Sequence, residues 1–505
     1  MSQELAYGFA LDYWAKRQHE KIAVQTDHCS ISYGALHETS SRLAAALQAH
    51  GAQAGDPVLI FMPNCIEFPI VFYAAAKLGL NIVPANALYK IVEIRQLIHQ
   101  IHPKLAFVCS DDTAELVRTA DRDIPIIYAS LNNTSFQHLL DTKAHISAFP
   151  ADLTTPCVYV STSGSTGKLK FVSRSYLSQI VPAKLYLQAL HATQDDILLS
   201  YLPMSQQFGM AALLCACIAG CTAVLLSHFH PGDALSVIEQ NRVTIQYGVP
   251  TMFMEEIEAF NTMDHKPDIS SLRTGIVAGA AGVRDVFQWF DQQIGCRLLN
   301  CYGATEVAGI TMTDLDDPAS IRYSTCGRAL PNTSIEILDD TGRSLPPGCP
   351  GEVVCTTPWV MREYVGEVSL TNQVLDSQRR FLTGDIGTLD HEGHLTICGR
   401  KKDIIIRGGY NIFPAEVELA LLRCTGISEA CVMGYRDKIL GERICAFVKM
   451  KSGAEKSEEN IRSQLENDIA KYKLPDQIVF LKEIPKLAGG KNDCAKLAEI
   501  LQTLP

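Results

Sequence analysis

The chain has 505 residues, more than one hydrophobic core usually supports, so two or more domains are expected. Hydrophobic residues make up 47% of it and charged residues 20%, which is typical of folded globular proteins and excludes a disordered or fibrous chain. The formal net charge of −11 argues against a nucleic-acid-binding surface, and no nucleic-acid partner is expected.

Strands and helices alternate through the first part of the chain. Residues 31–33 read as a strand end that enters a helix with apolar positions Leu36, Leu43 and Leu47, ended by Gly51. A further helix is expected at 66–78, and apolar strands are expected at 56–62, 82–83, 103–108 and 124–128. The less patterned stretch 111–155 is expected to be rich in loops.

The alternation resumes further along, with strands expected at 158–160, 197–202, 222–226, 244–248, 274–278 and 297–301. Strands that alternate with helices predict parallel sheets covered on both faces. After residue 322, short strands with turn signals predict antiparallel hairpins; they lie at 334–338, 351–356 and 387–389. The expected fold class is α/β, with two parallel-type α/β subdomains and a small β-barrel-like subdomain in residues 1–400, and a smaller α+β domain in 401–505.

The cysteines do not indicate a disulfide or metal scaffold. The first ten residues lack the basic region and apolar run of a secretory signal, so reduced thiols and a cytoplasmic location are expected. Cys215, Cys217 and Cys221 lie in the apolar run 211–226, and their spacing predicts buried core thiols in place of a zinc site. The run is shorter than the roughly 18–20 apolar residues of a membrane-spanning helix, so no span is expected.

A loop of small and hydroxyl-bearing residues follows the apolar strand at 158–160. Its residues are Thr162, Ser163, Gly164, Ser165, Thr166 and Gly167, with Lys170 just beyond. Glycine lets the backbone approach a phosphate, while N–H groups, hydroxyls and lysine bind it. A P-loop would need glycine where the chain has Thr162 and Ser or Thr where it has Leu169. A solvated Ser/Gly turn stays open as the other interpretation.

The loop resembles the signature of the adenylate-forming superfamily, which includes acyl- and aryl-CoA synthetases, amino-acid adenylation domains and luciferases. Lys170 stands at the family's lysine position, while Leu169 replaces its usual proline and Phe171 its usual glycine. Four further motifs follow in the family's order, and the resemblance covers residues 33–497. It implies a large AMP-binding domain in 1–400 and a mobile lid domain in 401–505.

The resemblance implies an ATP site built from three motifs. Tyr302 would stack on adenine, Asn300 would contact its amino group, Thr305 would contact the α-phosphate, and Glu306 would hold Mg²⁺. Asp385 would bind the ribose hydroxyls. The turn of Ala280, Ala281 and Gly282 would line the other face of the base, and Cys301 and Gly303 are the remaining nucleotide-binding residues of the adenine and metal motif. Taken alone, Glu306 could be a helix-start carboxylate and Asp385 a turn former.

The resemblance also assigns the hinge and the catalytic lysine. Arg400 would contact ribose or phosphate, Lys402 would be the pivot, Gly409 would line the thiol channel, and Lys491 would be the catalytic lysine. A carboxylate and the α-phosphate of ATP repel each other, so this chemistry needs fixed positive charge between them. Lys491 and Mg²⁺ would supply it. A solvated lysine in a Gly-rich turn is the other reading of Lys491.

The class of acid that the enzyme activates can be inferred from the residues expected to line the acid pocket. Amino-acid adenylation domains carry an aspartate where residues 202–209 have no acidic residue, so an α-amino acid is not expected. Gln206 stands near the position of a histidine common in CoA synthetases. The expected pocket residues are mostly apolar and suit an aryl or aliphatic acid; they are Gln206, Gln207, Tyr247, Gly248, Val249, Ala278 and Gly279.

Three functions stay open from the sequence. The first is ATP-dependent acyl-adenylate formation followed by thioester formation with CoA. The second is a stand-alone adenylation enzyme that loads the acid onto the phosphopantetheine of a separate carrier protein. The third is a catalytically silent nucleotide-binding relative.

Overall fold

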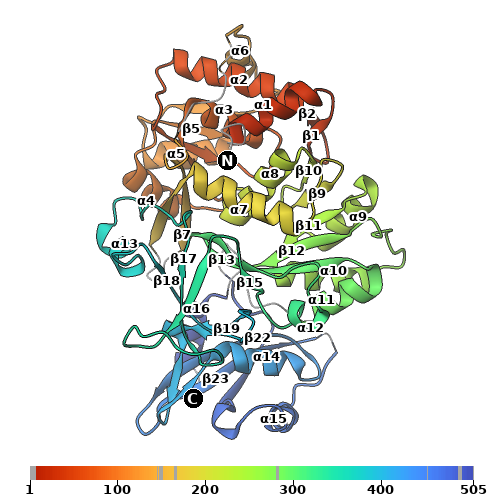
Figure 1. Cartoon of the computed structure of the whole chain (residues 1–505), viewed down its shortest axis with the longest axis vertical. Coiled ribbons are helices and arrows are strands. Elements are labelled where there is room, and N and C mark those ends of the chain that lie inside the picture. Colours follow the sequence, from red (N-terminus) through yellow and green to blue (C-terminus); the bar gives the residue numbers. More distant parts are fainter. Residues whose placement is uncertain are drawn as a thin grey trace. The chain divides into compact units, whose positions relative to one another are not determined.

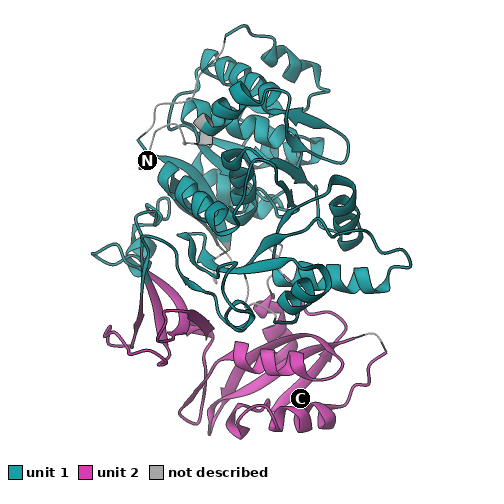
Figure 2. Cartoon of the chain, turned by 45° about the vertical axis from the view of Figure 1, so that its right-hand side comes forward, with its two compact units in different colours: residues 1–335, 355–381 teal, residues 336–354, 382–505 magenta. Residues whose placement is uncertain are grey.

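The computed structural model describes residues 7–144, 146, 152–163, 168–279, 284–451, 453–486 and 492–503. The chain divides into two compact units, residues 1–335 with 355–381 and residues 336–354 with 382–505 (Figure 2). The second unit therefore contains hairpin strands that precede residue 401 as well as the segment that follows it. The expected α/β class is confirmed for the chain.

The first unit contains a sheet of nine strands in the order β15-β14-β13-β12-β11-β9-β10-β1-β2 (Figure 1). The strands from β1 to β13 along this order pair in parallel, and both edges of the sheet are antiparallel. The strand bounds are β1 Ile22–Gln25, β2 Ser30–Ser32, β9 Ile197–Ser200, β10 Thr222–Leu225, β11 Ile245–Gly248, β12 Thr274–Ala278, β13 Arg297–Ala304, β14 Ala308–Met312 and β15 Arg328–Ala329.

A second sheet in this unit has six strands in the order β6-β5-β3-β4-β7-β8. Its pairs are parallel except β7 with β8, which form an antiparallel pair at one edge. The bounds are β3 Pro57–Phe61, β4 Asn81–Pro84, β5 Leu105–Val108, β6 Ile126–Tyr128, β7 Pro156–Ser163 and β8 Leu169–Ser175. Parallel sheets with helical connections are thus confirmed for both halves of this unit.

The helices of the first unit begin and end where the local sequence favours it. Ser32 caps α2 by accepting the N–H of Ala35, and Gly79 ends α3 with a left-handed φ of 69°. The bounds are α1 Tyr7–Arg17, α2 Tyr33–Ala49, α3 Glu67–Leu78, α4 Ile91–Ile101, α5 Asp111–Ala120, α6 Thr134–Leu140, α7 Tyr176–Ala189, α8 Gln207–Ala219, α9 Pro231–Asn241, α10 Pro250–Thr262, α11 Arg284–Trp289, η2 Phe290–Ile294, α12 Ala319–Arg322 and α13 Val368–Val374.

The expectation that residues 111–155 are rich in loops is wrong for two segments, α5 and α6. Ser110 caps α5 by accepting the N–H of Thr113, and Asn133 caps α6 by accepting the N–H of Phe136. Both helices are short and bury only a few side chains, so their apolar pattern is too sparse to stand out.

The second unit contains two smaller sheets. A four-stranded sheet in the order β16-β17-β18-β19 forms where the barrel-like hairpins were expected, and the other sheet has the order β21-β20-β23-β22, with β24 beside β23. The strand bounds are β16 Ser334–Leu338, β17 Gly351–Thr356, β18 Phe381–Leu389, β19 Leu395–Arg400, β20 Ile405–Arg407, β21 Tyr410–Ile412, β22 Ile427–Asp437, β23 Gly441–Met450 and β24 Gln477–Leu481. The helix bounds are η3 Lys401–Asp403, α14 Pro414–Arg423, α15 Glu458–Glu466, η4 Lys471–Lys473 and α16 Cys494–Gln502.

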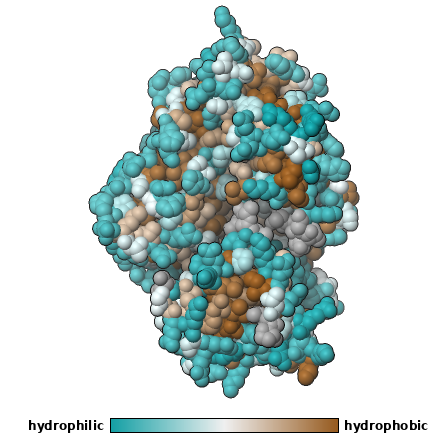
Figure 3. All heavy atoms as spheres, turned by 180° about the vertical axis from the view of Figure 1, so that it is seen from behind, coloured by the Kyte–Doolittle hydropathy of each residue, from teal (hydrophilic) through white to brown (hydrophobic). Residues whose placement is uncertain are grey.

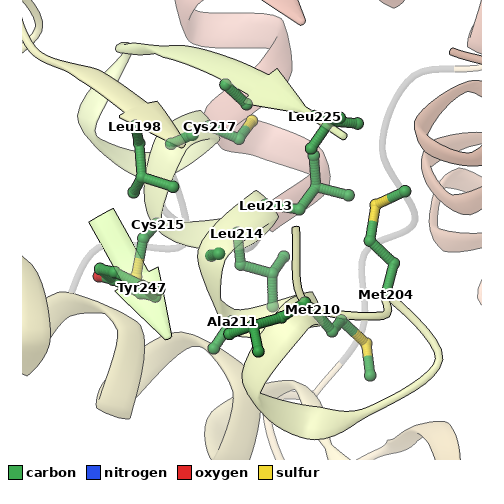
Figure 4. Close-up of a cluster of buried hydrophobic side chains, with 14 of the residues drawn as sticks. Leu198, Met204, Met210, Ala211, Leu213, Leu214, Cys215, Cys217, Leu225 and Tyr247 are labelled. Carbon is green, nitrogen blue, oxygen red and sulfur yellow. The ribbon is translucent and has the colours of Figure 1, made fainter. Parts of the chain in front are cut away.

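The cysteine-rich run 211–226 forms α8 and β10 within the core of the first unit. Cys215, Cys217 and Cys221 are buried, and burial raises the pKa of each thiol to about 12. Figure 4 shows Cys215 and Cys217 among leucine and methionine side chains. The three cysteines therefore occupy core positions, as the sequence predicts.

The visible face of the chain in Figure 3 is hydrophilic over most of its area, with separate hydrophobic areas between. Among the described residues, no helix combines the length and the apolar character that crossing a membrane requires.

Candidate active site

The tip of the β13–β14 hairpin carries Thr305 and Glu306. A Cβ at Gly303 would lie 1.8 Å from the carbonyl oxygen of Ala308, so only glycine fits there. Ala308 itself adopts a left-handed φ of 57°, and the strand register shifts between Tyr302 and Gly303. The backbone conformation of the hairpin is therefore constrained where the predicted phosphate and metal residues lie.

The backbone and the carboxylate of Glu306 are both held by hydrogen bonds. The N–H of Met361 donates to the Glu306 carbonyl oxygen at 2.6 Å, and the hydroxyl of Tyr364 donates to Oε1 at 2.6 Å. Tyr364 reaches Glu306 because residues 362–365 run beside β8, where Tyr364 bridges to Val172. Oε2 of Glu306 accepts no hydrogen bond from any described residue.

The predicted phosphate loop connects β7 to β8, and β8 is the strand that lies beside this tyrosine. β7 and β8 are antiparallel, with Thr162 opposite Lys170, and Nζ of Lys170 lies 5.3 Å from the centroid of the Tyr364 ring. Lys170 and Glu306 thus contact the same aromatic side chain. Ser163 is the last residue of β7, and the loop residues Gly164, Ser165, Thr166 and Gly167 lie outside the described residues.

Arg174 on β8 supports the hairpin from inside the protein. Its side chain is completely buried, and its Nη1 donates to the carbonyl oxygen of Thr305 at 2.8 Å. Its Nη2 donates to the carbonyl oxygen of Ser178 in the first turn of α7. Burial lowers the pKa of Arg174 to about 10, a shift that neighbours including Glu306 oppose. The guanidinium is therefore still positive at neutral pH.

The strands β11, β12 and β13 are neighbours and bring several predicted residues to one edge of the large sheet. Gly248 ends β11 and Ala278 ends β12. Gly279 has a left-handed φ of 89°, and its ideal Cβ position lies 3.4 Å from the Val249 side chain. Ligands bind α/β sheets at the carboxyl ends of such strands. Ala280, Ala281 and Gly282 lie outside the described residues.

The two glutamines of the predicted acid pocket lie where α8 begins. Gln206 precedes the helix, and its carbonyl oxygen accepts the N–H of Met210 at 3.0 Å. The side-chain amides of Gln207 and Gln179 on α7 form a reciprocal pair, with two hydrogen bonds of 3.1 Å each. Gln179 is buried. Each amide in the pair thus donates to the other and accepts from it.

Tyr247 lies deeper than the other predicted pocket residues. Its ring is completely buried, stacks on Phe208 with a centroid separation of 5.6 Å, and lies beside Cys215 (Figure 4). The side chain therefore packs in the core between β11 and α8, and Phe208 of α8 covers one face of it.

The predicted adenine residues lie along β13. Asn300 is buried, and its Nδ2 donates to the carbonyl oxygen of Thr325 at 2.8 Å. This bond fixes the amide orientation, and no described donor bonds its Oδ1, the atom that an adenine amino group would need. Cys301 is buried in the core, where burial raises the pKa of its thiol to about 12. Tyr302 is half-buried and follows on the same strand.

The second unit brings together two of the predicted nucleotide residues. Asp385 on β18 and Arg400 on β19 are cross-strand partners, and Nε of Arg400 lies 3.0 Å from Oδ1 of Asp385. Lys402 is exposed in the short helix η3 that follows β19. Gly409 is the second residue of a two-residue turn between β20 and β21, where both glycines have positive φ. Lys491 lies outside the described residues.

Three residues of this arrangement were not predicted from the sequence. Tyr364 lies in a segment without helical or strand periodicity, and Gln179 is one polar residue in a largely apolar helix. Arg174 gives the clearest signal, because it is a lone arginine in a strand whose last positions are otherwise apolar or hydroxyl-bearing. The partners of all three are distant in the sequence.

The residues present fit a magnesium ion that arrives with ATP. Within the described ranges, no group of three or more His, Cys, Asp or Glu side chains could hold a metal ion. Mg²⁺ commonly binds through one or two carboxylates together with substrate phosphates. The Glu306 carboxylate accepts a hydrogen bond from Tyr364 at Oε1 and none from any described residue at Oε2, which suits that role.

Family models match most of the chain. The model of the AMP-binding enzyme family matches residues 11–365, and that of the AMP-binding enzyme C-terminal domain matches residues 416–491. The chain therefore belongs to the AMP-binding enzymes, the adenylate-forming superfamily that its motifs predict.

The chain is similar to several named CoA ligases. The chain is 30% identical over 502 residues to the medium-chain fatty-acid–CoA ligase of Escherichia coli (strain K12), a match that covers 95% of this chain and 88% of that protein. It is 32% identical over 493 residues to the indoleacetate–CoA ligase of Aromatoleum aromaticum, covering 95% of each. The o-succinylbenzoate CoA synthetase of Bacillus subtilis, solved with its acyl-adenylate intermediate, superposes with a TM-score of 0.85, 26% identity and 97% coverage of each chain.

Proposed function

We propose that this chain is an AMP-forming acid–thiol ligase that joins a carboxylic acid to CoA. A carboxylate oxygen attacks the α-phosphorus of ATP, which gives an acyl-adenylate and releases pyrophosphate. The CoA thiol then attacks the acyl carbon and AMP leaves. The observation that carries the proposal is the Glu306 carboxylate, which follows Thr305 in the chain and is oriented by Tyr364, a residue that also lies beside β8 and Lys170. The names of the relatives support CoA as the acceptor.

The first half-reaction brings two anions together, so the chain must supply positive charge. Mg²⁺ held by Glu306 would neutralise part of the phosphate charge. Lys170 would bind phosphate from the base of the loop, and Thr305 would donate to the α-phosphate. Lys491 would lie between the carboxylate and the α-phosphate, where one well-placed donor is worth roughly 3–4 kcal/mol of transition-state stabilisation.

The second half-reaction needs Lys491 to withdraw so that the thiol can approach. We propose that residues 401–505 form a mobile lid that turns about Lys402. This residue is exposed in a short helix between the two sheets of the second unit, where a few backbone dihedral angles can absorb the motion. Gly409 would then line the thiol channel, and its positive φ favours glycine there.

The substrate class is an aryl or aliphatic acid and not an α-amino acid. The helix α8 contains no charged residue, and its Phe208 stacks on Tyr247 beside the strand ends that carry Gly248 and Val249. An α-ammonium group would find no acidic side chain in residues 202–209. The fatty-acid and indoleacetate substrates in the relatives' names belong to the proposed class.

ATP–pyrophosphate exchange over a panel of aryl, medium-chain aliphatic and amino acids tests the proposal. We expect Mg²⁺-dependent exchange with aryl or aliphatic acids, and formation of the acyl-CoA and AMP when CoA is added to the best acid. If the enzyme catalyses exchange and acylates a holo carrier protein but forms no thioester with CoA, then the carrier protein, and not CoA, is the acceptor. No exchange with any acid would contradict the proposed activity.

A further inference from the structure

Arg174 is a buried cation that no carboxylate of the described residues pairs with. Its side chain has no exposed surface, and its Nε makes no hydrogen bond in the part of the chain that the structure describes. Burying a charge without a partner of opposite sign is costly. Lys77, another buried cation of the first unit, has the usual solution: its Nζ lies 2.6 Å from Oδ1 of Asp12. A structural need for a buried ion pair therefore does not explain Arg174.

The guanidinium instead binds two backbone carbonyls from separate parts of the fold. One is the carbonyl of Thr305, at 2.8 Å from Nη1, and the other is the carbonyl of Ser178, bound by Nη2. A planar guanidinium can hold two acceptors at a fixed angle, which a lysine ammonium cannot. Arg174 thus fixes the tip of the β13–β14 hairpin relative to the first turn of α7.

This contact fixes the orientation of Glu306. The carbonyl of Thr305 and the N–H of Glu306 belong to one peptide group, and in a trans peptide they point in opposite directions. Arg174 holds the Thr305 carbonyl, and Met361 holds the Glu306 carbonyl at 2.6 Å. Both peptide groups that flank the Glu306 side chain are therefore fixed, while Tyr364 fixes the carboxylate itself.

We propose that Arg174 is a positioning residue for Mg²⁺-ATP, which fixes the Thr305–Glu306 peptide and adds a buried positive charge behind it. The charge lies behind this peptide in a buried environment where it is weakly screened, so it would add to the positive potential that the phosphates meet. The inference rests on the proposed function, because it takes Thr305 and Glu306 as the phosphate and metal residues. It adds a residue whose side chain contacts the peptide that carries them, and not the nucleotide.

The test compares Arg174→Met and Arg174→Lys with Lys77→Met, a matched loss of another buried cation whose partners are Asp12 and His37. Calorimetric titration measures ATP affinity with and without Mg²⁺, and exchange assays measure kcat and half-saturating Mg²⁺. We expect Arg174→Met to weaken the Mg²⁺-dependent gain in ATP affinity by about ten- to a hundredfold, as for residues that orient metal ligands. Arg174→Lys keeps the positive charge but loses the planar guanidinium that binds two carbonyls, so we expect a smaller loss of the Mg²⁺-dependent ATP affinity.

The expected control result is that Lys77→Met lowers the melting temperature and leaves the Mg²⁺ dependence unchanged. A folded Arg174→Met protein with wild-type Mg²⁺ dependence of both ATP binding and exchange would overturn the inference. If that variant does not fold, the same result for Arg174→Lys overturns it. The binding measurement separates the two proposals: a wild-type chain that binds Mg²⁺-ATP but exchanges no acid contradicts the proposed activity, while the affinities of the variants still decide the role of Arg174.

Discussion

The hydroxyl of Tyr364 donates a 2.6 Å hydrogen bond to Oε1 of Glu306. Burial, followed by the negative charge of Glu306, raises the pKa of Tyr364, so the hydroxyl keeps its proton and acts as a donor at neutral pH. One carboxylate oxygen is thereby occupied, and no described residue donates a hydrogen bond to the other. Under the proposed function, the tyrosine would determine which oxygen of Glu306 meets Mg²⁺.

Replacing Tyr364 by phenylalanine removes this donor and keeps the ring. We expect half-saturating Mg²⁺ in the exchange assay to rise about ten- to a hundredfold, because the carboxylate loses the group that orients it. Tyr323→Phe is the matched control, since that hydroxyl donates to Asp291 at 2.5 Å, outside the candidate site. Equal Mg²⁺ dependence in both variants would contradict the role assigned to Tyr364.

Replacing Lys491 by alanine separates the two half-reactions. We expect adenylate formation to fall at least about a hundredfold, the usual cost of losing one electrostatic donor at a transition state. Thioester formation from a supplied acyl-adenylate should be largely retained, because the role proposed for the lysine is confined to adenylate formation. Lys496→Ala, an exposed lysine in α16, is the control and should leave both rates unchanged. An equal loss in both half-reactions would exclude the role of Lys491.

The buried carboxyl of Glu256 makes the stability of the first unit depend on pH. Burial raises the pKa of Glu256 to about 8 from its ordinary 4.5, and Nε2 of Gln246 donates to its Oε2 at 2.6 Å. Because the folded state binds the proton more tightly, the contribution of Glu256 is fully present below pH 4.5 and is lost as the pH rises to 8. The loss approaches about 1.4 kcal/mol per pH unit within that window.

Glu256→Gln removes the titrating carboxyl group and replaces it with a carboxamide of nearly the same size. We expect the free energy of unfolding of the wild type to fall relative to the variant as the pH rises from 5 to 8 (roughly the window between the two pKa values). Tryptophan fluorescence in urea reports on this unit, because Trp14, Trp289 and Trp359 all lie within it. A difference between the two proteins that stays constant with pH would show that Glu256 does not titrate there.

Asp12 should stabilise the fold mainly because it compensates the buried positive charge of Lys77. The Lys77 side chain is completely buried and its Nζ lies 2.6 Å from Asp12, which also contacts His37 at 2.7 Å. Asp12→Asn leaves the ammonium buried beside a neutral group, so we expect a loss of about 3–5 kcal/mol in the free energy of unfolding. The double variant Asp12→Asn/Lys77→Met should recover part of it. A double variant less stable than Asp12→Asn would contradict this account.

Periodicity predicts the parts of the fold that depend on local pattern. The apolar strands at 56–62, 274–278 and 334–338 and the helix before Gly79 are present, because burial on both faces or on one stripe leaves a direct mark on the sequence. The helices α5 and α6 are missed because capping by Ser110 and Asn133, and not a wide apolar stripe, defines where they begin.

The sequence predicts only those parts of the candidate site whose residues are contiguous in the chain. The motif that contains Thr305 and Glu306 is contiguous, so its chemistry can be read from residue types. Arg174 lies 131 residues before Thr305, and Tyr364 lies 58 residues after Glu306. No local rule pairs residues that far apart, because their contact depends on β8, residues 362–365 and the β13–β14 hairpin meeting in the folded unit.

The reciprocal bond between Gln179 and Gln207 has a consequence for acid selectivity. A hydroxylated or charged substituent that separates the two carboxamides must replace both bonds at once, or leave a buried polar atom unsatisfied at a cost of about 1–3 kcal/mol. In the acid pocket proposed above, a hydrocarbon substituent would lie against the closed pair of Gln179 and Gln207 without breaking these bonds. The chain would thus disfavour polar acids through a bond that it makes with itself, before the acid makes any contact of its own.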